Sequence, residues 1–170
     1  MDMKSNLFSL SNLCAIGNVS DAADYAFSVL SKYTECTRFG TLGVVGKLKG
    51  DSDYTLMLDA HIDEIGFIVT DVDDNGFLTV AKCGGIDLRT LPARPVTVHA
   101  KEKITAVFCS TPPHLSDDEK EYKDIGEIKL DSMLGKKAKD LISVGDYVTY
   151  RQTAAELLNG KVTGKSLDDR

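Results

Sequence analysis

The middle of the sequence repeats one pattern, in which short apolar runs of strand type alternate with residues that favour turns. Two such runs, at 67–72 and 77–82, flank Asp73-Asp74-Asn75-Gly76, and Asn-Gly between apolar runs is a strong hairpin signal. Further strand-type runs follow at 96–100, 103–109, 126–130 and 147–151. Several short strands at close spacing, with Gly, Pro and Asp between them, predict a small β-barrel or sandwich. Residues 132–141 are expected to form the one helix of this region.

The sequence before this region mixes helical and strand patterns. Apolar residues recur at helical spacing in 7–14 and again in 22–30, and Ser20 or Asp21 is expected to cap the second helix. Strands are expected at 34–39, 42–48 and 54–59.

These patterns predict a divided organisation. We expect an α/β unit at 1–66, an inserted all-β unit at 67–160, and a return to the α/β unit at 161–170.

Chemistry-bearing residues stand where one apolar run gives way to another. The run at 56–58 is followed by His61, Asp63 and Glu64, and a second apolar run occupies 65–69. Nε2 of a histidine at a strand end can bind a divalent ion, while a carboxylate two residues on fixes the ring through Nδ1–H. His61 could equally be a capped histidine with solvated acids beside it. From these residues alone, both interpretations stay open.

Four further segments accompany the His61 segment in a fixed order. They are GGIDLRTLPARPVTVHA at 84–100, STPPHLSDDEK at 110–120, VGDYVTY at 144–150 and NGKVTGKSLDDR at 159–170. Together the five segments resemble the glutamyl aminopeptidase family of co-catalytic metallopeptidases, which includes the self-compartmentalising tetrahedral aminopeptidases. The resemblance covers 54–170 and implies an α/β catalytic domain interrupted by a small, barrel-like β dimerisation domain.

The resemblance also implies a site with two divalent metal ions that activate a water molecule. By motif, His61 ligates one metal, Asp63 orients His61, and Asp168 bridges the two metals, whereas Glu64 and Asp169 are not expected to ligate. The general-base Glu and the remaining ligands are expected beyond the end of this chain, because members of the family are about twice as long. Zinc or cobalt is expected, although a set of His and carboxylate ligands also suits manganese.

Composition argues against several partners. A net charge of −6 disfavours nucleic acid, since neutralising phosphates requires clustered Lys and Arg. No apolar stretch reaches the ~18 residues of a membrane span, and the N-terminus lacks a signal-peptide core. The four cysteines show no C-x-x-C pairing, so reduced thiols and a cytoplasmic location are expected.

The two other histidines are not expected to bind the metal ions in this chain. His99 belongs to a strand-type run and is expected to be structural. His114 lies on a polar loop at 111–123, from which it could approach a neighbour's active site in an oligomer.

The sequence therefore predicts a metal-dependent aminopeptidase that removes N-terminal residues from peptides. This chain would be its N-terminal half, inactive alone and holding no metal or a weakly bound ion. The alternative is a non-catalytic oligomerisation fragment built on the β unit. In both cases we expect a homo-oligomer through the β unit, with a dimer as the building block and a dodecamer as the candidate full-length assembly.

Overall fold

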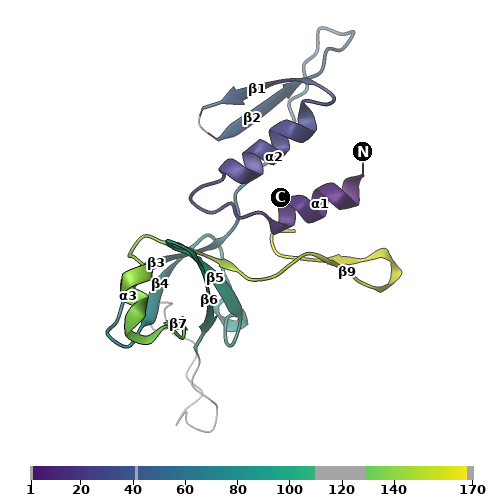
Figure 1. Ribbon diagram of the computed structural model, residues 1–170. Coiled ribbons are helices and arrows are strands. Elements are labelled where there is room, and N and C mark those ends of the chain that lie inside the picture. The colour runs from purple at the N-terminus through teal and green to yellow at the C-terminus, as the bar shows by residue number, and fades with distance from the viewer. Residues whose placement is uncertain (1, 41, 110–128, 168–170) are drawn as a thin grey trace. The chain divides into compact units, whose positions relative to one another are not determined.

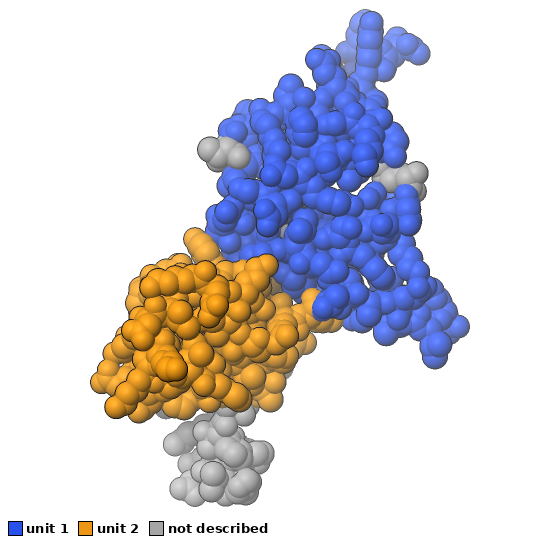
Figure 2. All heavy atoms as spheres, in the orientation of Figure 1, with its two compact units in different colours: residues 1–64, 153–170 blue, residues 65–152 orange. Residues whose placement is uncertain are grey.

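The computed structural model describes residues 2–40, 42–109 and 129–167. The chain forms two compact units: unit 1 comprises residues 1–64 with 153–170, and unit 2 comprises residues 65–152 (Figure 1; Figure 2). Unit 2 thus starts slightly before the expected residue 67 and ends well before the expected residue 160, because 153–160 lies with unit 1. None of the helices among the described residues is long and apolar enough to cross a membrane.

Unit 2 is built around short antiparallel strands. They are β3 (Gly66–Val72), β4 (Phe77–Cys83), β5 (Pro95–His99), β6 (Lys103–Phe108), β7 (Lys129–Asp131) and β8 (Tyr147–Tyr150). The strands pair in the order β3-β4-β7-β6-β5-β8, and β8 pairs again with β3, so the sheet closes on itself. The predicted small barrel is confirmed.

Side chains that alternate along the strands fill the barrel interior. In β5 and β6, every second residue is buried, as period-2 strand geometry requires. The Phe67 ring meets Phe108 edge-on with ring centroids 4.9 Å apart, and Tyr150 at 5.8 Å. The other buried members of this core are Val69, Leu78, Val80, Ile86, Leu91, Val96, Val98, Ile104, Ala106, Leu130, Ala138, Ile142 and Val148.

The predicted hairpin between β3 and β4 is also confirmed. The Asp73 N–H donates to the Phe77 carbonyl at 2.9 Å, and one Asp73 carboxylate oxygen accepts from the N–H groups of Asn75 and Phe77, both at 2.9 Å. Gly76 has a φ of +88°, which glycine adopts without a Cβ penalty.

The helix predicted at 132–141 is wrong in its first half. A 3-10 turn, η4 (Gly135–Lys137), precedes a single α-helical turn, α3 (Ala138–Leu141). Met133 and Gly135 have φ values of 56° and 55°, and left-handed backbone cannot continue a right-handed helix. A further 3-10 turn, η1 (Leu88–Thr90), precedes β5.

Unit 1 begins with two helices. The carboxylate of Asp2 caps α1 (Met3–Asn12) by accepting from Lys4 N–H at 3.1 Å and Ser5 N–H at 3.3 Å. For α2 (Ser20–Leu30) the expected caps are wrong: Val19 is the N-cap without a side-chain bond, and Asn18 accepts from the Ser20 N–H at 3.0 Å. A small core of Ala15, Val19 and Ala22, with Leu13, Leu42 and Ile62 against it, surrounds the start of α2.

Two of the three strands expected in unit 1 are present. β1 (Glu35–Phe39) and β2 (Gly43–Lys47) form an antiparallel hairpin. The third, at 54–59, is wrong, since this segment has no regular structure and Leu56, Met57 and Leu58 are 70%, 82% and 88% exposed. No strand among the described residues pairs with it, and an apolar strand of this type needs neighbours on both sides.

The returning chain is attached to α1. It contains the short paired strands β9 (Ala155–Glu156) and β10 (Val162–Thr163), with a 3-10 turn, η5 (Leu158–Gly160), between them. The Asn12 side chain accepts from the Ala154 N–H at 2.8 Å, and Lys4 forms an ion pair with Glu156. These contacts hold residues 154–156 against α1.

Candidate metal site

His61 and Asp63 face solvent from one side of an extended segment. Exposure alternates from His61 to Glu64, with His61 and Asp63 outward and Ile62 and Glu64 inward. Ile62 packs against the small core at the start of α2, which anchors the segment between the two outward residues.

The carboxylate of Asp63 lies where it can orient the His61 ring. His61 Nδ1 lies 3.0 Å from Asp63 Oδ1 and 3.2 Å from the Asp63 carbonyl oxygen. A carboxylate at Nδ1 fixes the tautomer and ring orientation, which directs Nε2 toward a metal ion. The donor set of an imidazole with a carboxylate behind it therefore fits a divalent ion at His61.

Glu64 has an entirely different environment from its neighbours. Its side chain is 3% exposed and lies against the Lys165 side chain, which is 8% exposed. Lys165 Nζ is 2.7 Å and 2.9 Å from the two carboxylate oxygens. The Ala15 N–H donates to Oε1 at 3.0 Å, and the Ser166 hydroxyl donates to Oε2 at 2.5 Å.

These contacts give Glu64 a structural role. A carboxylate oxygen accepts about two hydrogen bonds, so the bonds from Ala15, Lys165 and Ser166 use most of the capacity of Glu64. Its backbone is fixed as well, because the Glu64 N–H donates to the Ala15 carbonyl at 2.9 Å. The expectation that Glu64 does not bind metal thereby acquires a physical reason.

The contacts of Lys165 and Ser166 with Glu64 were not predicted from the sequence. Lys165 also donates from Nζ to the Leu13 carbonyl at 3.1 Å, and the Ser11 hydroxyl donates to the Lys165 carbonyl. Ser166 has a φ of 56°, a left-handed conformation that costs a non-glycine residue about 1 kcal/mol or more. The position of Glu64 next to an apolar run is a sequence signal for such a contact, since a buried carboxylate needs a cationic partner.

Asp168, the other expected ligand in this chain, lies outside the described residues, as does Asp169, which was not expected to ligate. Across 2–40, 42–109 and 129–167, no three His, Cys, Asp or Glu side chains gather closely enough to hold a metal ion. A metal at His61 would therefore need donors from beyond those ranges.

Of the two remaining histidines, the structure describes His99. His99 lies on β5 with Nε2 2.9 Å from the Thr149 hydroxyl of the neighbouring strand, in keeping with a structural part. His114 falls outside the described residues.

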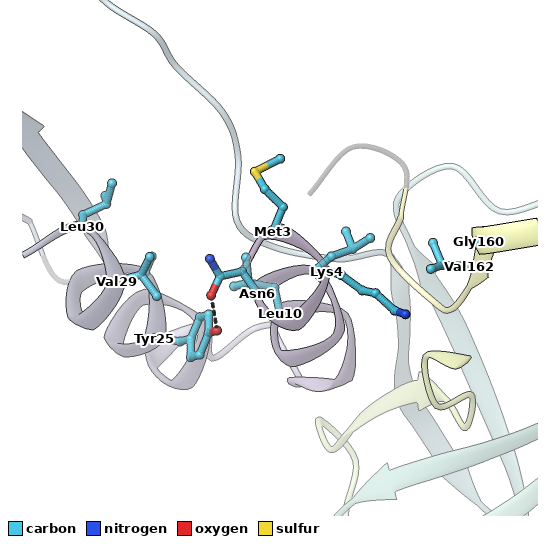
Figure 3. Close-up of a pocket in the computed structure, with 11 residues that line it drawn as sticks. Met3, Lys4, Asn6, Leu10, Tyr25, Val29, Leu30, Gly160 and Val162 are labelled. Carbon is cyan, nitrogen blue, oxygen red and sulfur yellow. Dashed lines mark hydrogen bonds between the residues drawn. The ribbon is translucent and has the colours of Figure 1, made fainter. Parts of the chain in front are cut away.

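Unit 1 also contains an apolar cavity of about 620 Å³ (Figure 3). It is lined mainly by α1 and α2, and Figure 3 shows the Tyr25 hydroxyl turned to the Asn6 side chain, to which it donates at 2.9 Å. Lys4 is the only charged residue among the described residues that line it.

Known proteins share both the fold and the sequence pattern. The FrvX protein of Escherichia coli (strain K12) is 26% identical over 176 residues, covering 97% of this chain and 49% of FrvX. An aminopeptidase from the archaeon Desulfurococcus kamchatkensis superimposes with a TM-score of 0.85 at 27% identity, covering 96% of this chain and 47% of that one. The TET1 peptidase of Pyrococcus horikoshii can assemble into a tetrahedron or a large octahedral shell. It superimposes with a TM-score of 0.83 at 27% identity, covering 99% of this chain and 52% of that one.

The fold is thus one found in aminopeptidases of known structure. The model of the M42 glutamyl aminopeptidase family matches residues 43–170, and the chain belongs to that family. It spans about half the length of the relatives that it matches.

Proposed function

We propose that the protein is a metal-dependent aminopeptidase and that this chain carries part of its metal site. The observation that carries the proposal is the His61–Asp63 pair, 3.0 Å apart on the outward side of a segment within the family match. His61 would bind a divalent ion, zinc or cobalt, through Nε2, and Asp63 would hold the ring. Asp168 would serve as the bridging carboxylate.

Divalent ions at such a site would polarise the scissile carbonyl and lower the pKa of water. The described residues would position the metal ligand. Asp63 keeps His61 in one tautomer, and Ile62 anchors the segment to the small core of unit 1. The general base and further ligands would come from sequence that this chain does not contain. By itself, the 170-residue chain is therefore expected to show no turnover.

We propose the cytoplasm as the location, supported by four cysteines that show no C-x-x-C pairing in the sequence. The assembly of the TET1 peptidase supports a homo-oligomer, and we propose that it forms through unit 2. A barrel with its own buried core also favours the second candidate, a non-catalytic oligomerisation module, because such a unit can fold without a complete unit 1.

A peptidase assay on the product of the complete reading frame separates the two candidates. An aminopeptidase hydrolyses an amino-acid p-nitroanilide with a free amino group and spares its N-acetylated counterpart. Chelation should abolish turnover, and zinc or cobalt should restore it. A purified, folded oligomer without turnover after metal addition would favour the non-catalytic module instead.

A further inference from the structure

The peptide group between Asp63 and Glu64 connects the His61 ring to the interior of unit 1. Its carbonyl oxygen lies 3.2 Å from His61 Nδ1, and its N–H donates to the Ala15 carbonyl at 2.9 Å. We propose that Glu64 is a positioning residue, which acts through this peptide group to hold His61 in the tautomer that a metal ligand at Nε2 requires. The proposal rests on the proposed function, because it assumes that His61 binds a metal ion.

The first argument is the tautomer of His61. A backbone carbonyl can only accept a hydrogen bond, so Nδ1 must be the donor in its contact with the Asp63 carbonyl. The Asp63 carboxylate, 3.0 Å from the same nitrogen, is a second acceptor for that proton. Both acceptors place the proton on Nδ1 and the lone pair on Nε2, which is the nitrogen that would bind the metal.

The second argument is the rigidity of the peptide group. A trans peptide is planar and its carbonyl and N–H point in opposite directions, so fixing the Glu64 N–H also fixes the direction of the Asp63 carbonyl. Glu64 is bonded twice to Ala15, which is fully buried: its N–H donates to the Ala15 carbonyl, and its Oε1 accepts from the Ala15 N–H at 3.0 Å. The side chain of Glu64 therefore supports the backbone bond that aims the carbonyl at His61.

The third argument is the contrast in burial along the segment. The side chains of His61 and Asp63 are 52% and 67% exposed, and water competes with contacts of that kind. The Glu64 carboxylate is buried and is held by Lys165 at 2.7 Å and 2.9 Å and by the Ser166 hydroxyl at 2.5 Å. The order that the exposed pair lacks is thus supplied from the buried side.

A buried ion pair could instead serve stability alone, and two double variants distinguish these roles. Glu64→Gln with Lys165→Met removes both charges, but the amide oxygen can still accept from the Ala15 N–H. Glu64→Leu with Lys165→Met also removes that acceptor while keeping a side chain of similar volume. The two double variants therefore differ chiefly in the contact of residue 64 with Ala15.

Ala23→Gly controls for a general loss of stability. Ala23 is fully buried in α2, and none of the bonds named above involves it. Glycine inside a helix is destabilising, so this variant should have a lower thermal midpoint with the His61 contacts intact.

The first readout is the tautomer of His61 in the metal-free, 15N-labelled 170-residue chain, from long-range 1H–15N NMR correlations at pH ~8, where an ordinary imidazole is neutral. The sequence has three histidines, so His61→Ala assigns the signal. The wild type, the Gln double variant and Ala23→Gly should show His61 with its proton on Nδ1. The Leu double variant should show a mixture of the two tautomers.

The second readout is the zinc dissociation constant of the complete reading-frame product, measured by competition with a chromophoric chelator. The Leu double variant should bind zinc roughly 10–100-fold more weakly than the Gln double variant, the usual effect of losing an outer contact of a metal site. Ala23→Gly should bind zinc like the wild type.

Four results would overturn the proposal. If the Leu double variant keeps either the wild-type tautomer or the wild-type zinc affinity, Glu64 does not position the metal ligand, and the proposed function stands. A mixture of tautomers in the wild type would remove the first argument, and a mixture in Ala23→Gly would show that the ring follows overall stability. If the wild type holds the proton on Nδ1 but binds no zinc, the proposed function fails, and Glu64 orders a ring that is not a metal ligand.

Discussion

Glu64 shows how differently two adjacent acids can behave. Asp63 is exposed and faces the His61 ring, whereas Glu64 is buried against Lys165, which is 101 positions away in the sequence. The direction in which each side chain points decides the difference, because neighbours on an extended segment face opposite ways.

At the residue scale, the Lys165 ammonium is expected to stabilise the buried Glu64 carboxylate. Lys165→Met keeps the length of the side chain but leaves the Glu64 carboxylate buried without its cation. Removing one partner of a buried pair typically costs about 3–5 kcal/mol, so urea unfolding should show a loss of that order.

The double variant Glu64→Gln with Lys165→Met is the control, because it removes both charges and should recover much of the stability. A single Lys165→Met variant as stable as the wild type would show that the ion pair is not buried in solution.

At the scale of elements, the β3–β4 hairpin depends on Gly76. A Cβ at this position would lie 2.2 Å from the Gly135 carbonyl oxygen, and the φ of +88° disfavours any other residue. Gly76→Ala should therefore destabilise the barrel by about 2 kcal/mol or more.

Gly85→Ala is the matched change, because nothing lies within 4 Å of its added Cβ. It should shift the unfolding free energy by less than about 0.5 kcal/mol. Equal effects of the two substitutions in urea unfolding would refute the role assigned to Gly76.

The same hairpin should respond to acid through Asp73. Burial raises the pKa of its carboxyl, but the N–H groups of Phe77 and Asn75 and the Lys129 ammonium lower that pKa more, leaving it below its ordinary value of 3.8. A depressed carboxyl pKa contributes stability above the unfolded value, and this contribution is lost as the pH falls through the folded value.

The thermal midpoint should therefore fall less between pH ~5 and pH ~3 in Asp73→Asn than in the wild type. Asp71→Asn, on the neighbouring β3 strand, is the control and should keep the acid dependence. An Asp73→Asn variant with the full acid dependence would be inconsistent with this account.

Elements whose signals are local could be predicted from the sequence. The hairpin at Asn75-Gly76, the helices of unit 1 and the barrel strands each depend on neighbouring residues. The strand at 54–59 could not, since an apolar run becomes a strand only where other strands pair with it, and none among the described residues does. The contact of Glu64 with Lys165 is equally non-local, whereas the His61–Asp63 pair spans two positions and could be inferred.

At the scale of the whole molecule, we predict self-association through the barrel. Light scattering of the 170-residue chain at micromolar concentration should give a mass well above the 18.5 kDa of one chain. The exposed run containing Leu56 and Leu58 is a competing contact surface, because apolar patches promote association.

Serine substitutions at Leu56 and Leu58 separate the two surfaces. If the barrel is the interface, the variant should keep the mass of the wild type. A shift of the variant to monomer would assign association to the exposed run, and a monomeric wild type would contradict self-association altogether.

Zinc content, measured by elemental analysis, shows whether His61 binds a metal ion with Asp63 behind it. The complete reading-frame product would be loaded with zinc and dialysed as wild type, His61→Ala, Asp63→Asn and, as an exposed control acid, Asp59→Asn. We predict that His61→Ala loses its zinc, Asp63→Asn retains some with affinity lowered roughly 10–100-fold, and Asp59→Asn matches the wild type. Equal zinc content in all four proteins would contradict the account.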